Sequence, residues 1–486
     1  MFIKSIFCDK MGAVEEEMGV DEMAGQIHKF KIFNKNIILD VNSGSVYTVD
    51  DLVFDVLDLY YKNPREEIMK SLKKKYNQEE IEEAIGEIEQ LIKQDILFSD
   101  ADFGFVWENL NERDYVKALC LNVAHDCNLR CKYCFASKGD YQGKRELMTK
   151  RVGREAVDFL IQNSGHITHL EIDFFGGEPL LAYDTVREVV NYARSKEKDS
   201  GKKFHFTMTT NGVLLKDDVL EYLHENMDNV VLSIDGRKKV NDRIRVRVDG
   251  SGSYDIIINN IKKMVELRER DRKEYYVRGT FTKDNLDFSE DVLHLADQGF
   301  SRISIEPVVG VDGDFLLDDG DVEKIYEEYD KIAREYLKRK QSGQKTFRFY
   351  HFNVNIYHGP CIYKRLNACG AGRDYLAVTP SGEIYPCHQF VGNNEFLMGN
   401  VQDKKIDERI IKRFKDTHVF SKKECRDCWA RFFCSGGCNA NNFLINGDLN
   451  QPYDITCKLQ KKRIEYAIYL SIMEKGKFKE HVNTMC

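Results

Sequence analysis

Three cysteines lie within the eight residues CNLRCKYC. Cys127, Cys131 and Cys134 are separated by three and then two residues, and they follow YVKALCLNVA (115–124), an apolar run typical of a buried strand. We expect Cys120, inside that run, to be a core residue. A structural zinc site takes four ligands, so three thiols in one loop fit zinc poorly. They fit better an iron–sulfur cubane with one iron left open to a cofactor.

The composition indicates the compartment in which these cysteines work. Neither the N-terminus nor any later segment of the 486 residues has an apolar run of signal-peptide or membrane-spanning length. We therefore expect a cytoplasmic protein, in which most of the 14 cysteines bind metal or perform chemistry rather than form disulfides. The 72 basic and 80 acidic residues are interspersed and give a net charge of -8, so we expect neither nucleic acid nor membrane as a partner.

The segment between the two cysteine-rich regions has an α/β pattern. Four cysteines lie between Cys120 and Cys134, eight lie between Cys361 and Cys457, and Cys8 and Cys486 stand near the ends. Apolar runs predict strands at 115–124, 170–179, 206–212, 230–236, 275–282 and 303–309, and amphipathic runs predict helices such as 152–163, 183–197 and 254–270. The sequence therefore predicts a partial (β/α)6 barrel rather than one of eight units.

Residues at the ends of these strands are candidates for a ligand site. LEIDFFGGEP (170–179) ends in Gly176 and Gly177, which leave room for a ligand near the backbone, then Glu178, which can accept a hydrogen bond from an ammonium group, and Pro179. A simple strand-to-helix turn would also explain the glycines. Further strands end in Asn211, Ser233 and Asp235, which taken alone are turn formers or helix caps.

The CxxxCxxC loop and the GGEP motif resemble those of the radical S-adenosylmethionine (SAM) enzymes. The resemblance implies a [4Fe-4S] cluster on Cys127, Cys131 and Cys134, whose open iron is chelated by SAM, and a 5'-deoxyadenosyl radical that removes a hydrogen atom from the substrate. It places the SAM amino group at the GGEP motif, and the adenine near Tyr133. It also implies that Asn211, Ser233 and Asp235 reach the ribose or sulfonium, and that Arg245 pairs with the SAM carboxylate, with Arg243 and Arg247 as competitors. It assigns no catalytic side chain.

The second cysteine region is the more specific pattern. Its spacing is Cx12Gx4C, a gap, Cx2Cx5Cx3C, a gap and a last cysteine, and it resembles the SPASM domain of radical SAM peptide-modifying enzymes. The resemblance implies two auxiliary [4Fe-4S] clusters, the first on Cys369, Cys387 and Cys438 and the second on Cys425, Cys428, Cys434 and Cys457. Paired zinc knuckles are the alternative. Either Cys361 supplies an eighth ligand, or the first auxiliary cluster keeps an open iron for a substrate thiolate.

The residues before the barrel suggest a small domain. Residues 29–51 read as three short strands with a turn at 42–44, and two helical patterns follow, one at LVFDVLDLYY (52–61) and one introduced by a capping box at Asn77 and Glu80. This winged-helix-like arrangement resembles the precursor-peptide recognition element, to which a leader peptide adds as an extra strand. A purely structural domain is the alternative.

The order of the modules resembles the maturases of six-cysteine peptides over about residues 28–465. That resemblance implies thioether formation between a cysteine sulfur and the α-carbon of an acceptor residue, threonine in this family, in a ribosomally made precursor peptide. Flavodoxin or ferredoxin would donate electrons. A sulfatase-maturing activity that makes formylglycine and a non-enzymatic iron–sulfur electron carrier are the alternatives.

The predicted boundaries follow from these modules. They are an N-terminal extension (1–26), the peptide-recognition domain (27–98), the partial barrel (112–315), a helical linker (316–359), the SPASM domain (360–465) and a C-terminal tail (466–486).

Overall fold

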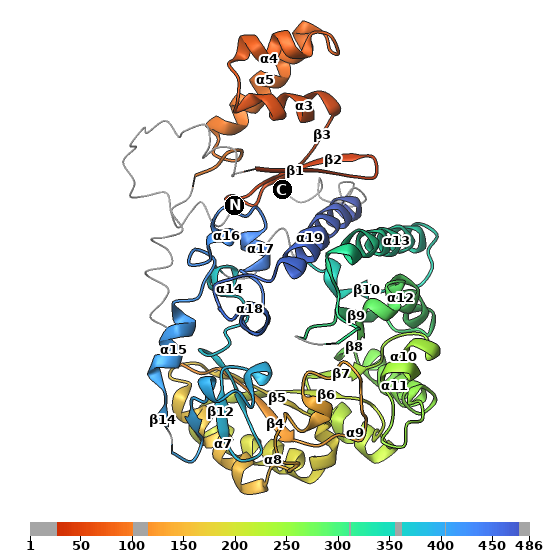
Figure 1. Cartoon of the computed structure of the whole chain (residues 1–486), viewed down its shortest axis with the longest axis vertical. Helices are drawn as coiled ribbons and strands as arrows, with labels where there is room; N and C mark the ends of the chain where they lie inside the picture. The colour runs from red at the N-terminus through yellow and green to blue at the C-terminus, as the bar shows by residue number, and fades with distance from the viewer. Residues whose placement is uncertain (1–26, 101–114, 311–312, 355–361, 404, 476–486) are drawn as a thin grey trace. The chain divides into compact units, whose positions relative to one another are not determined.

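The computed structural model describes residues 27–100, 115–310, 313–354, 362–403 and 405–475. The chain divides into two compact units, Met1–Asp102 and Phe103–Cys486 (Figure 1). The predicted N-terminal extension and Cys8, Cys361 and Cys486 lie outside the described residues. Among the helices that the structure describes, none has the length and apolarity needed to cross a membrane.

The first unit is a three-stranded antiparallel sheet followed by helices. The strands are β1 (Ile27–Ile32), β2 (Lys35–Asp40) and β3 (Val46–Val49), in that order across the sheet. The helices are α3 (Asp51–Tyr60), α4 (Arg65–Leu72) and α5 (Gln78–Lys93). The predicted strands and the two predicted helices are confirmed. The capping box is also confirmed, because the Asn77 side chain accepts from the Glu79 amide at 3.0 Å and Glu80 accepts from the Asn77 amide at 3.3 Å.

A core of its own holds this unit together. Val56 and Leu57 of α3 and Ile81 of α5 are fully buried, and they pack in one cluster with Ile38 of β2. Burying such aliphatic side chains contributes about 1.5–3 kcal/mol each, so the apolar faces of the helices specify their packing on the sheet.

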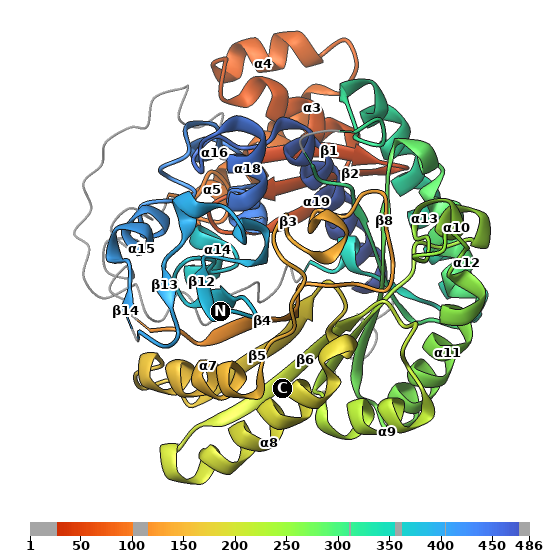
Figure 2. The ribbon, with the colours of Figure 1, turned by 60° about the horizontal axis from the view of Figure 1, so that its bottom comes forward.

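The second unit contains six consecutive parallel strands, as predicted. They are β4 (Ala118–Ala124), β5 (His169–Gly176), β6 (Lys203–Thr210), β7 (Asn229–Ser233), β8 (Glu274–Phe281) and β9 (Arg302–Pro307). The connecting helices are α7 (Lys150–Asn163), α8 (Tyr183–Ser200), α9 (Asp217–Asn226), α10 (Lys238–Ile244), α11 (Tyr254–Arg270) and α12 (Phe288–Asp297). Figure 2 shows these helices around the outside of the curved sheet. The protein has the mixed α/β fold of a partial (β/α) barrel.

Alternation along the strands separates an apolar outer face from a polar inner one. In β5, Leu170, Ile172 and Phe174 are fully buried, whereas Asp173 and Phe175 between and after them are only partly buried. The outer face packs under the helices because side chains of a strand alternate between faces. The inner, polar face of the barrel, which we call the lumen, is therefore available for a ligand.

Both edges of the parallel sheet are extended by later segments. β10 (Arg348–Phe349) pairs with β9, and β11 (Tyr375–Val378) pairs in parallel with β4. Three short antiparallel strands follow β11, namely β12 (Glu383–Tyr385), β13 (Gly399–Asn400) and β14 (Lys405–Ile406). The predicted linker thus holds β10 as well as the helix α13 (Val322–Gln341).

Helices complete the cysteine-rich region. They are α14 (Ile362–Asn367), α15 (Glu408–Lys415), α16 (Lys423–Arg426), α17 (Arg431–Cys434), α18 (Asn439–Asn446) and α19 (Asp454–Lys475). Helix α19 runs through the predicted boundary at 465, because Ala467 and Ile468 are fully buried and continue the packed face that begins at Ile464. Residues 466–475 are part of the folded unit, not of a tail.

Candidate functional site

The cysteine loop follows β4 at the carboxyl edge of the sheet. The Leu129 amide lies 3.4 Å from the Cys127 sulfur, and the Asn211 side-chain amide lies 3.6 Å from it. Burial raises the pKa of Cys127 to about 12 and that of Cys131 to about 11. Burial thus opposes ionisation of these two thiols, which must lose their protons when they bind a metal.

Two buried donors beside the loop have no acceptor. The side-chain nitrogen Nδ2 of Asn128 and the Nε of Arg245 make no hydrogen bond with any residue that the structure describes. A buried donor without an acceptor costs about 1–3 kcal/mol. Cluster sulfides and a carboxylate are acceptors, so the surroundings of the loop fit an anionic cluster and an amino-acid ligand.

Both glycines of the GGEP motif are required by close backbone approach. A Cβ on Gly176 would lie 2.3 Å from the Ala124 carbonyl oxygen, and one on Gly177 would lie 2.2 Å from that of Asp126. The Gly177 amide donates to Ala124 at 2.7 Å, and the Glu178 amide donates to Asp126 at 2.8 Å. In this structure the glycines therefore admit the start of the cysteine loop, where the sequence suggested room for a ligand.

The Glu178 side chain is buried among protein donors. Its carboxylate accepts from the Leu180 amide at 3.1 Å, the Thr210 hydroxyl at 2.7 Å and the Asn211 amide at 2.8 Å. Burial raises the pKa of Glu178, and these hydrogen bonds oppose the shift. Pro179 begins a short 3-10 turn directly after it. Glu178 thereby fixes the end of β6. The side-chain amide of Asn211 in turn donates to the side-chain oxygen of Asn128 at 2.7 Å.

Tyr133, Asp235 and Arg245 form a buried triad on the other side of the loop. The Tyr133 hydroxyl donates to Asp235, 2.8 Å from Oδ1, and accepts from Arg245 Nη1 at 2.9 Å. Asp235 also accepts from the Thr280 amide of β8 at 3.1 Å. Burial raises the pKa of Asp235 to about 6, while Arg245 opposes the shift. Three predicted site residues from the loop, β7 and the end of α10 are thus in direct contact.

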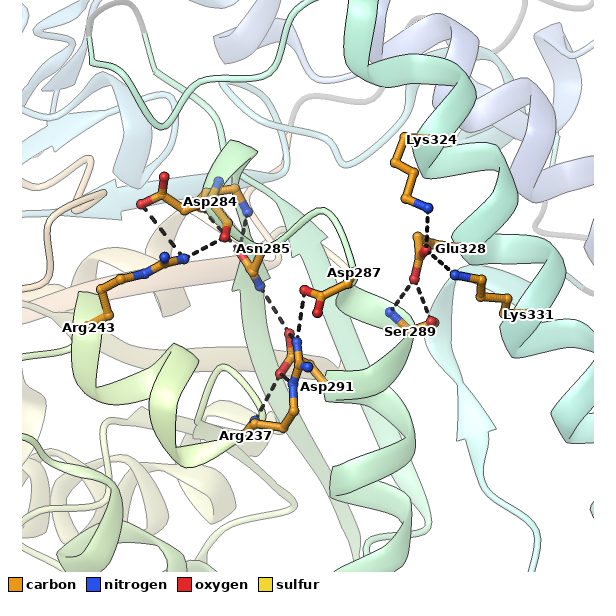
Figure 3. A network of polar contacts seen from close by, with 11 residues as sticks. Arg237, Arg243, Asp284, Asn285, Asp287, Ser289, Asp291, Lys324, Glu328 and Lys331 are labelled. Atoms are coloured by element: carbon orange, nitrogen blue, oxygen red, sulfur yellow. Dashed lines mark hydrogen bonds and ion pairs between the residues drawn. The ribbon is translucent and has the colours of Figure 1, made fainter.

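The backbone after Asp235 is held by a polar network (Figure 3). A Cβ on Gly236 would lie 2.3 Å from that of Asp291, and both the amide and the Nε of Arg237 donate to the Asp291 carboxylate, at 3.0 and 2.8 Å. Asn285 donates to the same carboxylate at 3.2 Å. Arg243 donates to the Asp284 carbonyl at 2.6 Å and is therefore part of this network. Of the three competing arginines, Arg245 is the one that joins the triad.

The lumen wall between the loop and the cysteine-rich region is aromatic. Phe135, directly after Cys134, is 48% exposed, and its ring lies 5.5 Å from that of His388, which also packs on Phe175 at 4.8 Å. Sequence reasoning missed these residues, although each directly follows a cysteine or precedes the GGEP motif. Ser233, the remaining strand-end candidate, lies half-buried at the end of β7 and makes no side-chain hydrogen bond with the described residues of the loop or the triad.

The later cysteines fall into two sets. Burial raises the pKa of the Cys387 thiol well above its ordinary value, and the neighbouring thiols of Cys438 and Cys369 raise it further. In the second set, burial raises the pKa of Cys457 to about 12, with contributions from Cys434, Cys425 and Cys428. The electrostatic neighbours of Cys387 and of Cys457 are compatible with the two groups that the resemblance implies.

A buried lysine lies among the thiols of both sets. Lys422 is 1% exposed, and its ammonium donates to the Gly436 carbonyl and the Asn439 side chain, both at 2.8 Å. Burial lowers its pKa, and the thiols of Cys425, Cys434, Cys438 and Cys457 oppose the shift. An ammonium in this place compensates negative charge, so the surroundings fit anionic clusters.

The spacing of the thiols does not suit a single ion. Among the described residues, no three cysteine, histidine, aspartate or glutamate side chains converge on a point that one metal ion could occupy. Zinc requires four ligands within about 2.3 Å of the metal. Sets of thiols that are neighbours without converging are compatible with a larger inorganic core.

Comparisons with known proteins agree with this arrangement. Residues 121–271 match the Radical SAM superfamily, and residues 369–429 match SPASM, an iron-sulfur cluster-binding domain. The chain carries a radical SAM domain followed by a SPASM domain. The radical SAM domain contains the cysteine loop, the GGEP motif and the triad, and the SPASM match contains Cys369, Cys387, Cys425 and Cys428.

Relatives and solved structures match about two thirds to three quarters of the chain. The chain is 25% identical over 344 residues to the radical SAM cyclopropyl synthase TigE of Paramaledivibacter caminithermalis, covering 67% of this chain and 68% of TigE. It is 24% identical over 345 residues to a cysteine-type anaerobic sulfatase-maturating enzyme of Clostridium novyi, covering 66% and 86%. The structure of native anSMEcpe with bound AdoMet superposes with a TM-score of 0.60 at 20% identity, covering 74% of this chain and 99% of that one. This last likeness establishes the fold.

Proposed function

We propose that the protein is a maturase that forms intramolecular thioether crosslinks, from a cysteine sulfur to the α-carbon of an acceptor residue such as threonine, in a ribosomally made cysteine-rich precursor peptide. The observation that carries the proposal is the combination of one three-cysteine loop facing the lumen with two separate sets of later cysteines. Matching relatives carry out different reactions, so the likeness alone does not choose among them.

The proposal needs SAM and three [4Fe-4S] clusters. Cys127, Cys131 and Cys134 would hold the first cluster, and the two later sets would hold the auxiliary clusters, with Cys361 as a further candidate ligand. When bound and reduced, the first cluster would supply one electron for the cleavage of SAM, whose 5'-deoxyadenosyl radical would remove the α-hydrogen atom of the acceptor residue, and an auxiliary cluster would accept the electron released when the thiolate sulfur bonds to that carbon. Flavodoxin or ferredoxin would donate the electron.

The protein's own residues bind and orient these groups. The unpartnered Nε of Arg245 is available to a carboxylate, and the hydrogen bonds from Tyr133 to Asp235 hold the arginine beside the loop. Because Glu178 fixes Asn211, the side-chain amide of Asn211 stays within reach of the Cys127 sulfur. The rings of Phe135, Phe175 and His388 give one side of the lumen an apolar surface against which a substrate side chain can pack.

The first unit offers a surface for the leader peptide. β3 is an edge strand whose residues Val46, Tyr47 and Val49 are half-buried and Thr48 is exposed. An edge strand presents unpaired amides and carbonyls that a peptide strand can pair with. The unit's separate core indicates that it can keep this edge formed without the peptide.

A sulfatase-maturing activity is the second candidate, because one of the matching relatives carries that name. It would oxidise one cysteine or serine of a protein to formylglycine and would not require a leader. An iron–sulfur electron carrier is the third, and it would have no need of the SAM-binding triad.

One experiment separates the three. The anaerobically reconstituted protein is incubated with SAM and dithionite, alone, with the precursor peptide, and with the same peptide lacking its leader. A maturase releases 5'-deoxyadenosine and modifies the peptide only when the leader is present. Formylglycine formation without a leader supports the second candidate, and absence of 5'-deoxyadenosine supports the third.

A further inference from the structure

Arg278 of β8 and Glu306 of β9 are oppositely charged neighbours on the lumen face. In the parallel ladder Arg278 lies opposite Ser304 and Thr280 lies opposite Glu306, so the two side chains stand diagonally across adjacent strands. Arg278 is exposed, and the Glu306 side chain is 23% exposed. Both lie towards the carboxyl edge of the sheet, where the cysteine loop also lies.

Contacts from behind hold Glu306 in place. Its carboxylate accepts from the Ser304 hydroxyl at 2.7 Å and lies 2.8 Å from Nε2 of His351. The other ring nitrogen of His351 lies 3.3 Å from the Tyr329 hydroxyl, which accepts from Arg463 at 2.7 Å. Although burial opposes ionisation, His351, Arg463 and Arg278 lower the pKa of Glu306 well below its ordinary value. The group is a fixed, ionised carboxylate.

Arg278 has no such partner. Its guanidinium makes no hydrogen bond and no ion pair with any residue that the structure describes, although it is close enough to influence Glu306, His388 and Tyr350 electrostatically. Arginine carries five donors in a planar fork. The guanidinium and the carboxylate are thus near each other and not joined, with the exposed Tyr350 ring beside them.

We propose that Arg278 and Glu306 form a two-point site for the backbone of one substrate residue, in which the guanidinium donates to the backbone carbonyl of the acceptor residue and the carboxylate accepts from its backbone N–H. The inference rests on the proposed function, since it requires a peptide in the lumen. Its effect is positioning: gripping the peptide groups around one residue fixes the direction of the α C–H bond of that residue.

The test combines enzyme variants with a substrate variant. Arg278→Gln and Glu306→Gln keep the size of the side chains and remove their charges. Each is expected to raise KM for the precursor peptide about 10-fold or more, as expected for a hydrogen bond to a charged group. A synthetic precursor with an ester in place of the acceptor residue's amide lacks the N–H. With wild-type protein this ester precursor should show a similar rise in KM. With Glu306→Gln protein the ester should raise KM no further.

Matched controls come from the other end of the same strands. Arg302 of β9 and Glu274 of β8 form an ion pair of 2.6 Å at the amino end, outside the proposed site. Arg302→Gln and Glu274→Gln should leave KM for the peptide unchanged. Iron content and circular dichroism of every variant show whether the fold is intact.

The outcomes are distinct. If wild-type protein neither binds nor modifies the peptide, the proposed function fails and the two-point site fails with it. If wild-type protein modifies the peptide and the two lumen variants match the controls, the site alone is overturned. If the effects of Glu306→Gln and of the ester on KM add when the two are combined, the carboxylate does not accept a hydrogen bond from the N–H. The site is then also overturned.

Discussion

The Tyr133 hydroxyl lies 2.8 and 2.9 Å from the two carboxylate oxygens of Asp235, and this contact ties the cysteine loop to the end of β7. The same hydroxyl accepts from Arg245, so one oxygen atom connects the loop, the strand and the residue expected to bind the SAM carboxylate. The three side chains form one unit because burial makes each depend on the others.

Tyr133→Phe is expected to raise KM for SAM about 10-fold, because Arg245 and Asp235 both lose a hydrogen-bond partner. Tyr192→Phe is the control, since the Tyr192 hydroxyl makes a similar bond to Asp158 at 3.0 Å away from the site. Steady-state 5'-deoxyadenosine release measures both. An unchanged KM in Tyr133→Phe protein with full iron content would remove the triad from SAM binding.

Gly177→Ala is expected to displace the cysteine loop, because the new Cβ would meet the backbone oxygen of Asp126 at 2.2 Å. We predict the loss of about four iron atoms per chain and a lower Tm. Gly86→Ala in α5 is the control, since nothing lies within 4 Å of its Cβ and alanine favours a helix. Iron analysis and thermal unfolding test the pair, and full iron in Gly177→Ala protein would contradict the close approach.

The two later cysteine sets are expected to act independently. Cys387→Ala and Cys434→Ala should each lower the iron content by about four atoms per chain, and the double variant should lose about eight. Cys120→Ala is the control, because Cys120 is a buried core residue as predicted. If the purified protein instead contains zinc and each variant loses one zinc ion, the result would support zinc knuckles.

Asp173→Asn is expected to stabilise the fold increasingly as the pH rises. Burial raises the pKa of Asp173 from 3.8 to about 6, so the folded state disfavours the carboxylate. The cost of ionising it is absent below pH 3.8, grows as the pH rises and is fully present above about pH 6. The free energy of unfolding of Asp173→Asn should be higher than that of the wild type at both pH values. This difference should be about 1 kcal/mol larger at pH 7 than at pH 5. Denaturant unfolding at the two pH values tests this, and a difference that is constant or falls with pH would contradict the shift.

The sequence predicted the barrel well for a physical reason. In strands such as β5, buried apolar residues on the outer face alternate with less buried residues on the inner face, and the helices have amphipathic patterns of ordinary length. The resemblance to the SPASM domain grouped Cys387 with Cys438 and Cys369, and these two thiols contribute electrostatically to the raised pKa of Cys387. Local patterns suffice where each element's own residues determine its place.

Other features depend on contacts between distant segments. The pairing of β11 with β4, the continuation of α19 beyond 465 and the contact of the Phe135 ring with His388 depend on residues far apart in the sequence. Gly176 and Gly177 were identified correctly as positions without room for a side chain, but the group that approaches them is the chain's own backbone. The partner could not be known before the loop was placed.

The number of alkylatable cysteines in the peptide is the most direct test of thioether formation. The reconstituted protein is incubated with SAM, dithionite and the precursor peptide with its leader, then the peptide is reduced, alkylated and weighed by mass spectrometry. Thioether formation predicts a loss of two hydrogens and of one alkylatable cysteine for each crosslink, and reductant does not reverse this loss. Release of 5'-deoxyadenosine with every peptide thiol still alkylatable would contradict thioether formation.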